Sequence, residues 1–482
     1  MKLMYDITII GAGVVGGMVA RTLSKYKLKI CILEGQNDVA MGATKANSAI
    51  VHAGFDAKEG SLKALLNVRG CKMMESVCSE LGVSYKKNGS LVVGFDDNDR
   101  ATLNELLARG ITNGVEDLQL LEKEELKKLE PNLSDNVICA LYAPTAGIVC
   151  PYTLAIQAIG NAMDNGAELK CNFEVSCIEK TENGYRISSD NESVDTRIVI
   201  NCAGLYSDKI AGMIGDNSFD VHPRRGEYIL LDKECGDTVA CTIFRTPSKM
   251  GKGILVTPTV HGNLLLGPTS FDIEDKEDKD TTAEGFAKIL GNTHETVSGV
   301  QLNKTITSFC GLRSVGSTGD FIINSPEKGF INAAGIESPG LTSAPAIAEY
   351  IADMLKDEGF ELEANPEFNP TRKSYHAFGD ASMEEQNEMI KANPAYGKIV
   401  CRCEGITEGE IVDAIRRNPQ PHDLDGVKRR TRAQMGRCQG GFCGPYITEL
   451  LSKELGIPYE GVTKFGGDSL VNVELTKGGQ AQ

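Results

Sequence analysis

Residues 6–16 read DITIIGAGVVG, a β-branched apolar run that passes directly into a glycine-rich turn. The run is typical of a buried strand, and residues 18–25 have helical character, so the glycines lie in a strand–turn–helix context. In that context Gly11 permits the tight turn, Gly13 lets the backbone approach a pyrophosphate, and Gly16 allows close strand–helix packing. The helix N-terminus adds partial positive charge. These residues predict a dinucleotide-binding unit.

A second strand is expected at residues 28–33, ending at Glu34, which is placed to accept hydrogen bonds from a ribose. Enzymes that use both flavin and nicotinamide commonly carry two glycine fingerprints, and this sequence shows a single one. FAD alone is therefore the expected dinucleotide. Residues 42–54, GATKANSAIVHAG, are rich in small and hydroxyl residues, as is needed where backbone passes close to a flavin.

Length and charge limit the classes of protein to consider. A chain of 482 residues exceeds the roughly 250–300 residues that one core supports, so two or three domains are expected. The net charge of −16 argues against nucleic-acid binding, and an anionic substrate would need cations inside a pocket. Without a signal-peptide pattern or 18 consecutive apolar residues, a cytoplasmic chain with no transmembrane segment is expected. Peripheral membrane association through a partner stays open.

Four segments together resemble the D-amino-acid-oxidase-like superfamily of FAD enzymes. The similarity is to the branch of FAD-dependent glycerol-3-phosphate dehydrogenases and oxidases and L-2-hydroxyglutarate oxidases. The segments are NSAIVHAG (residues 47–54), VINCAGLYSD (199–208), RGEY (225–228) and GIESPGLT (335–342). The resemblance implies an α/β fold and FAD contacts at Gly11, Gly13, Gly16, Glu34, Thr44, Asn47, Ser48, Val175, Ala203, Gly204, Gly335, Gly340, Leu341 and Thr342.

The same resemblance sets the expected domain organisation. A doubly wound, Rossmann-like FAD domain would be assembled from separated segments, with an inserted mixed-sheet substrate domain, together spanning residues 1–365. The FAD segments lie near 1–85, 145–215 and 325–365, and the substrate domain near 86–144 and 216–324. A linker at 366–398, a small α-rich cysteine domain at 399–455 and a C-terminal tail at 456–482 complete the chain.

Three residues are candidates for the chemistry. Oxidation of an alcohol needs a group that takes the hydroxyl proton, and histidine is the natural base. His52 lies in a flavin-contacting segment, and the glycerol-3-phosphate oxidases that the chain resembles use a histidine there; a core histidine or a flavin attachment point are the alternatives. Arg313 lies in a segment similar to the Gly-x-Arg by which relatives hold a carboxylate or phosphate. Lys252 is a second candidate cation, with a solvated loop lysine as the alternative.

Four cysteines carry the most specific pattern. Cys401 and Cys403 form C-x-C, Cys438 and Cys443 form C-x4-C, and 34 residues separate the pairs. This spacing suits an iron–sulfur cluster better than disulfides, and it resembles the [2Fe–2S] domain of the bacterioferritin-associated-ferredoxin type. Structural zinc is the competing metal, although zinc modules more often use C-x2-C pairs, and an empty site is the third alternative. A capping box at residues 407–410 predicts a helix between the pairs.

Two charged stretches need an interpretation. The basic run KRRTR at residues 428–432 is expected to help neutralise an anionic cluster, with a partner-docking patch as the alternative. The charge-rich stretch at 272–280 is expected to be a solvated loop.

These observations predict an FAD-dependent dehydrogenase that oxidises sn-glycerol 3-phosphate to dihydroxyacetone phosphate. Electrons would pass through the flavin and a [2Fe–2S] cluster to a protein partner or a quinone path, because a cluster that carries one electron at a time suits onward delivery. L-2-hydroxyglutarate or another 2-hydroxy acid is the alternative substrate. A non-catalytic electron-transfer subunit of a flavoprotein complex is the alternative of another class.

Overall fold

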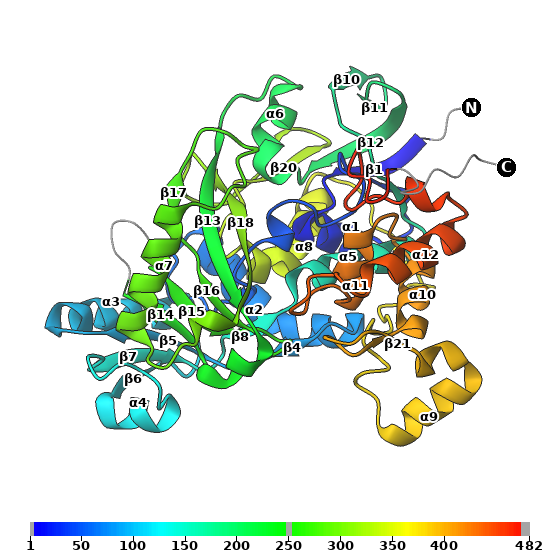
Figure 1. The fold of residues 1–482 in the computed structure, drawn as a ribbon. Helices are drawn as coiled ribbons and strands as arrows, with labels where there is room; N and C mark the ends of the chain where they lie inside the picture. The colour runs from blue at the N-terminus through cyan, green and yellow to red at the C-terminus, as the bar shows by residue number, and fades with distance from the viewer. Residues whose placement is uncertain (1–3, 247–252, 474–482) are drawn as a thin grey trace.

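A mostly parallel sheet of eight strands forms the centre of the computed structural model, which describes residues 4–246 and 253–473 (Figure 1). Strand β1 (Met4–Ile10) lies between β2 (Ile30–Leu33) and β12 (Ser193–Asn201), parallel to both. The carboxyl ends of these three strands meet at one edge of the sheet, because Ile10 is in register with both Leu33 and Asn201. The remaining strands are β9 (Glu168–Lys170), β10 (Cys177–Thr181), β11 (Gly184–Ser188), β19 (Ile322–Glu327) and β20 (Phe330–Ala334).

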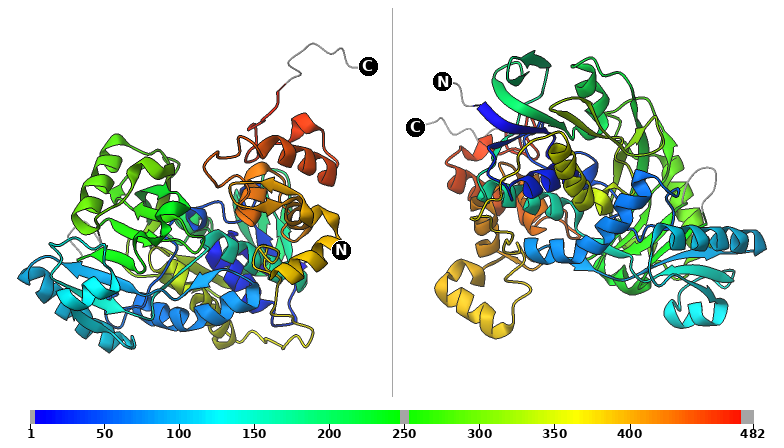
Figure 2. Two further views of the ribbon diagram at one scale, coloured as in Figure 1. Left: turned by 60° about the horizontal axis from the view of Figure 1, so that its bottom comes forward. Right: turned by 180° about the vertical axis from the view of Figure 1, so that it is seen from behind.

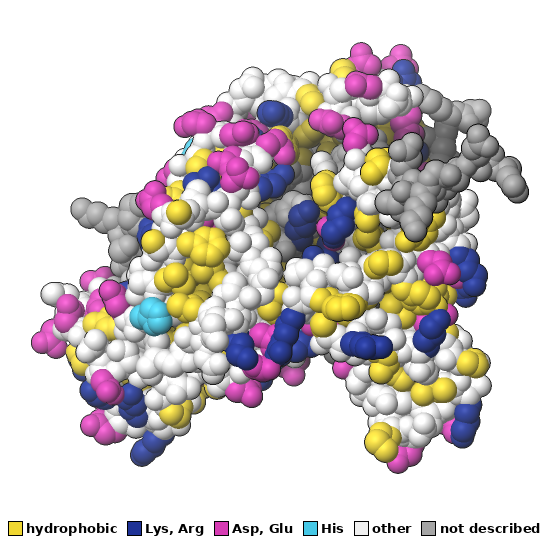
Figure 3. All heavy atoms as spheres, in the orientation of Figure 1, with side chains coloured by type: hydrophobic (Ala, Val, Ile, Leu, Met, Phe, Trp, Pro, Cys, Tyr) yellow, Lys and Arg dark blue, Asp and Glu magenta, His cyan; other side chains and the backbone are white. Residues whose placement is uncertain are grey.

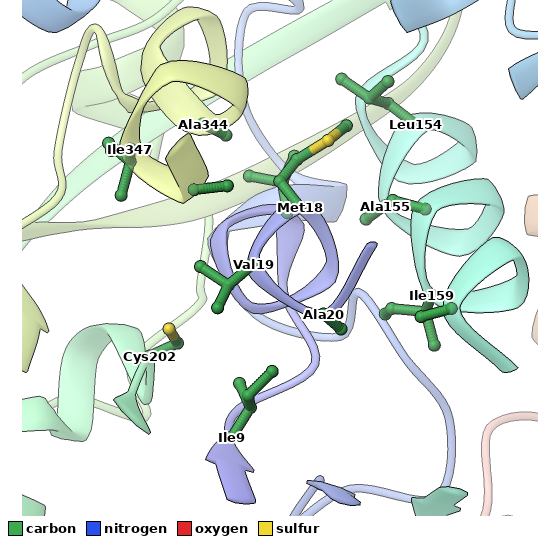
Figure 4. Close-up of a cluster of buried hydrophobic side chains, with 14 of the residues drawn as sticks. Ile9, Met18, Val19, Ala20, Leu154, Ala155, Ile159, Cys202, Ala344 and Ile347 are labelled. Carbon is green, nitrogen blue, oxygen red and sulfur yellow. The ribbon is translucent and has the colours of Figure 1, made fainter. Parts of the chain in front are cut away.

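Helix α1 (Val14–Leu23) connects β1 to β2 and is almost fully buried. It packs between α5 (Pro151–Asp164) and α8 (Gly340–Asp357), and α2 (Leu62–Leu81) packs on α8. Figure 4 shows the apolar side chains that meet there: Met18, Val19 and Ala20 of α1, Leu154, Ala155 and Ile159 of α5, and Ala344 and Ile347 of α8. This core fixes the start of α1 at the sheet edge, which is where a phosphate-binding turn has to lie.

A second sheet of nine strands lies beside the first. Its longest strands, β13 (Val221–Leu231) and β18 (Thr305–Gly316), pair antiparallel, whereas β14 (Thr242–Arg245) pairs parallel to β5 (Ser90–Gly94), so the sheet is mixed as expected. The other strands are β6 (Gln119–Glu122), β7 (Cys139–Ala143), β15 (Leu255–Pro258), β16 (Leu264–Gly267) and β17 (Phe271–Asp272). Helices α3 (Asp97–Asn113), α4 (Lys123–Leu129) and α7 (Ala283–Thr296) belong to this half.

Short elements connect the two halves. Strands β3 (Ile50–Val51), β4 (Tyr85–Lys86) and β8 (Gly147–Val149) form a small sheet, and α6 (Ser207–Gly212) follows β12. Together the two large sheets confirm the expected α/β class.

The C-terminal part forms a separate small module beside α5 (Figures 1 and 2). It contains β21 (Ile399–Cys401), β22 (Ile406–Thr407), α10 (Glu408–Arg416), α11 (Leu424–Thr431) and α12 (Gly444–Leu455) around its own apolar core. The capping box expected at the start of α10 is present. The stretch 366–398 contains helix α9 (Met383–Ala392), also started by a capping box. Among the helices of the described residues, none has the length and apolar character needed to cross a membrane.

Candidate functional site

The glycine-rich turn lies where the three parallel strands end. Gly11 has φ +104°, and a Cβ on it would lie 2.4 Å from the carbonyl oxygen of Cys202, so the turn admits no side chain there. The backbone N–H groups of Ala12 and Gln36 donate to the two carboxylate oxygens of Glu34, each at 2.9 Å. Burial raises the pKa of Glu34 despite these bonds. Glu34 is thereby held against the turn, where a ribose following a pyrophosphate would lie.

A cavity of about 1520 Å³ extends from this turn to the second sheet. It exceeds the roughly 300–1000 Å³ of ordinary ligand pockets, so it has space for a dinucleotide together with a substrate. Every expected FAD contact lines it except Gly16, Gly335 and Thr342. Gly16 lies behind the wall, where an added Cβ would come within 2.0 Å of the Gly11 carbonyl oxygen, and Gly335 packs on Gly316.

His52 lines the cavity, and its backbone is held on both sides. Its N–H donates to Oγ1 of the buried Thr342 at 2.9 Å, and its carbonyl accepts from the side-chain amide of Asn67 at 2.9 Å. Its ring lies against Phe244, and Nε2 is 3.3 Å from Oγ of Ser338. Thr342 therefore positions the backbone of His52 although it does not line the cavity itself, and Nε2 of the imidazole lies beside the hydroxyl group of Ser338.

A cationic and hydroxyl-bearing wall is formed by strands β13 and β18. Arg313 is the direct cross-strand neighbour of Arg224, and both line the cavity. Arg224 is paired with Asp272, whereas Nη2 of Arg313 donates to the carbonyl of Thr269 at 3.3 Å. Burial raises the pKa of Tyr228, although Arg313 beside it acts in the opposite direction. Lys252, the other candidate cation, lies outside the described residues.

The charged stretch 272–280 is mostly an exposed loop, as expected, and two ion pairs fix it to the rest of the protein. Lys276 and Glu277 line the cavity, and Lys276 is paired with Asp208 at 2.8 Å. Arg225 is paired with Asp278 at 2.8 Å. These ion pairs hold the loop against β13 and α6, beside the cavity. Figure 3 shows Lys and Arg side chains gathered near the centre of one face of the molecule.

Four further side chains that were not predicted as site residues line the cavity: Arg224, Tyr228, Phe244 and Ser338. Alternation along β13 was the available signal for two of them, because Arg224 and Tyr228 lie an even number of positions apart and so share one face. The hydroxyl groups of Tyr228 and Ser48 are 3.2 Å apart, which links that face to the flavin-contacting segment. No comparable local signal marked Phe244.

The four cysteines of the module come together as two pairs. Sγ of Cys403 and Sγ of Cys438 are 3.8 Å apart, and the thiols of Cys401 and Cys443 are hydrogen-bonded. That contact, together with the backbone N–H groups of Gln434 and Glu404, lowers the pKa of Cys401 to about 6. Backbone N–H groups of the loop 440–442 lower the pKa of Cys438. Amides aimed at sulfur stabilise thiolates, which are the form that ligates iron.

The pairing of the four cysteines bears on the metal that they could hold. Within residues 4–246 and 253–473, no group of three or more His, Cys, Asp or Glu side chains is arranged to hold a single metal ion. Two cysteine pairs instead fit a two-iron cluster, in which each iron takes two thiolates. All fifteen cysteines are free thiols. The donor set therefore fits [2Fe–2S] better than zinc or disulfides.

Two arginines of the basic run 428–432 have a role that the sequence did not predict. Arg429 and Arg430 form ion pairs with Asp38, which follows the Glu34 turn of the FAD domain. The side chains of Asp38 and Arg430 are 3% and 0% exposed, so neither a docking patch nor a shield for the cluster describes them. Arg432 is paired with Glu404. The run attaches the module to the FAD domain.

Comparison with known proteins agrees with this geometry. Residues 6–354 match the family model described as FAD dependent oxidoreductase, and residues 399–453 match that of a BFD-like [2Fe-2S] binding domain. The chain is 50% identical over 476 residues to a glycerol 3-phosphate dehydrogenase of Caloramator mitchellensis, covering 98% of this chain and 99% of that protein. It is 32% identical over 377 residues to a glycerol 3-phosphate oxidase of Mycoplasma pneumoniae, covering 76% of this chain and 97% of that protein.

A solved structure gives the same result for the fold. The dithionite-reduced L-α-glycerophosphate oxidase of Mycoplasma pneumoniae with FAD bound superposes with a TM-score of 0.73 at 31% identity, covering 77% of this chain and 99% of that one. The chain therefore belongs to the FAD dependent oxidoreductase family and carries a BFD-like [2Fe-2S] binding domain after it.

Proposed function

We propose that this chain is an FAD-dependent dehydrogenase that oxidises sn-glycerol 3-phosphate to dihydroxyacetone phosphate. The observation that carries the proposal is the 50% identity, over the whole chain, to a protein described as a glycerol 3-phosphate dehydrogenase. The cavity supports it, because it joins a histidine to cationic side chains, and an anionic alcohol needs both. The C-terminal cysteine module favours a dehydrogenase that delivers electrons onward over an enzyme that gives them to oxygen at the flavin.

In this proposal the chain's own residues bind the anion and take the proton. Arg313 holds the phosphate, since its planar guanidinium matches two phosphate oxygens, and Lys252 is a second candidate for the same contact. His52 takes the hydroxyl proton on Nε2. When bound, the flavin accepts the hydride from the carbinol carbon and the [2Fe–2S] cluster carries electrons singly. A one-electron carrier protein is the proposed acceptor, in the cytoplasm or at a membrane surface.

The test is anaerobic stopped-flow absorbance of the purified holoenzyme mixed with glycerol 3-phosphate or, separately, with L-2-hydroxyglutarate. We expect glycerol 3-phosphate to bleach the flavin band first and then the iron–sulfur absorbance. Faster bleaching by the hydroxy acid would replace the proposed substrate. A flavin that dithionite reduces but neither compound reduces would favour a non-catalytic subunit instead.

A further inference from the structure

The C-terminal segment contributes an aromatic side chain to the flavin cavity. Phe465 lies beyond the last helix of the cysteine module, yet it lines the same cavity as Gly13, Glu34 and His52. Phe465 is 55% exposed, so its ring is accessible to a ligand in the cavity. We propose that Phe465 is an FAD-binding residue, whose ring packs on the adenosine half of the cofactor.

The loop that carries Phe465 is fixed to the start of α11. The carbonyls of Thr463 and Lys464 accept from the backbone N–H groups of Leu424 and Asp425, at 3.2 and 2.9 Å. The N–H of Phe465 itself donates to Oγ of Ser469 at 2.9 Å. These hydrogen bonds fix the backbone that carries the ring, so the loop loses little conformational freedom when a ligand binds against it.

The neighbours of Phe465 place it at the adenosine end. A Cβ added to Gly466 would lie 2.4 Å from Cγ of Asn37, so the loop touches the FAD domain three positions after Glu34. The side-chain amide of Asn37 in turn donates to Asp423, at the N-terminus of α11. Because Glu34 marks the ribose position, this neighbourhood puts the ring near the ribose and the base of a bound FAD.

The module is also anchored firmly enough to hold this position. One carboxylate oxygen of Asp38 accepts from Arg430 at 2.9 Å, and the other accepts from both Arg429, at 2.5 Å, and Arg430, at 2.9 Å. These groups are buried, so water does not weaken the attachment. The FAD site consequently spans two domains: the glycine turn and Glu34 come from one, and the outer aromatic wall comes from the other.

Binding of two flavins to the full-length chain, freed of flavin, tests the proposal. Stacking of a base on an aromatic ring is worth about 1–3 kcal/mol, so Phe465→Ala should weaken FAD binding about 5- to 150-fold, measured as the Kd from quenching of flavin fluorescence. FMN lacks the adenosine half, and its Kd should stay the same. Phe465→Trp keeps an aromatic ring at this position and should bind FAD about as tightly as the unchanged protein. Leu470→Ala, in the same loop but not lining the cavity, is the matched control and should leave both Kd values unchanged.

Any of three results would overturn the proposal. An unchanged FAD Kd in Phe465→Ala would show that the ring makes no contact of consequence. Equal weakening of FAD and FMN, or the same loss in Leu470→Ala, would show a general disturbance of the loop. The proposal rests on FAD as the cofactor and not on the substrate proposed above. Because no substrate is present in this assay, its outcome and that of the stopped-flow experiment are independent.

Discussion

Asp38→Ala is expected to destabilise the folded chain by about 3–5 kcal/mol, the usual cost of removing one partner of a buried ion pair. Arg430 is fully buried and uses all its N–H donors: two bonds go to Asp38, two to the carbonyl of Pro419 and one to the carbonyl of Gly426. Without Asp38 its charge and two of those donors lose their partner. The expected loss of stability therefore comes mainly from the buried Arg430 that is left without its partner.

Urea unfolding of the full-length protein measures this loss of stability. Circular dichroism is the probe, because the chain has no tryptophan. The change in free energy of unfolding is the change in the urea midpoint multiplied by the slope m of free energy against urea concentration. Glu388→Ala is the control, since the pair Glu388–Lys391 is exposed and is worth about 0–1 kcal/mol. The double variant Asp38→Ala/Arg430→Met removes the carboxylate and the fully buried guanidinium and should recover part of the loss, since Arg429 stays without its partner. A loss below about 1 kcal/mol in Asp38→Ala, equal to the control, would refute the reasoning.

Four further predictions follow from the site. Burial opposes ionisation of Asp38, but Arg430 and Arg429 outweigh it and hold its pKa below the ordinary value. Its stabilisation is therefore complete above about pH 5 and should fade as the pH drops further, a loss that Asp38→Ala should not show in acid unfolding. Gly11→Ala should abolish FAD binding, measured as flavin retained on purification, because the added methyl meets the Cys202 carbonyl. His52→Ala should slow flavin reduction about 10²- to 10⁴-fold with FAD still bound, whereas His294→Ala, at an exposed histidine, should leave the rate unchanged. A His52→Ala rate equal to that of the unchanged protein would exclude His52 as the base. Cys403→Ser should lose the iron–sulfur absorbance and keep the flavin band, while Cys177→Ser, at another exposed cysteine, should keep both.

The local features of this chain could be predicted from sequence because each depends on neighbours a few positions apart. The strand and the glycines of residues 6–16 can be predicted from backbone geometry alone, since a positive φ or a close approach of the backbone to a neighbour decides where glycine is required. The spacing of Cys401, Cys403, Cys438 and Cys443 limits the ligand set in the same way. Family resemblance added the order of the segments.

The tertiary structure decided everything that depends on contacts between distant residues. Asp38 and Arg430 are 392 positions apart, and no local pattern distinguishes a buried arginine from one in a solvated basic run. The same holds for the ion pair of Arg225 with Asp278, which fixes the exposed loop 272–280 beside the cavity, and for Phe465, which reaches the cavity from the C-terminal module. Burial and charge pairing depend on which surfaces meet after folding, and the sequence alone does not state which those are.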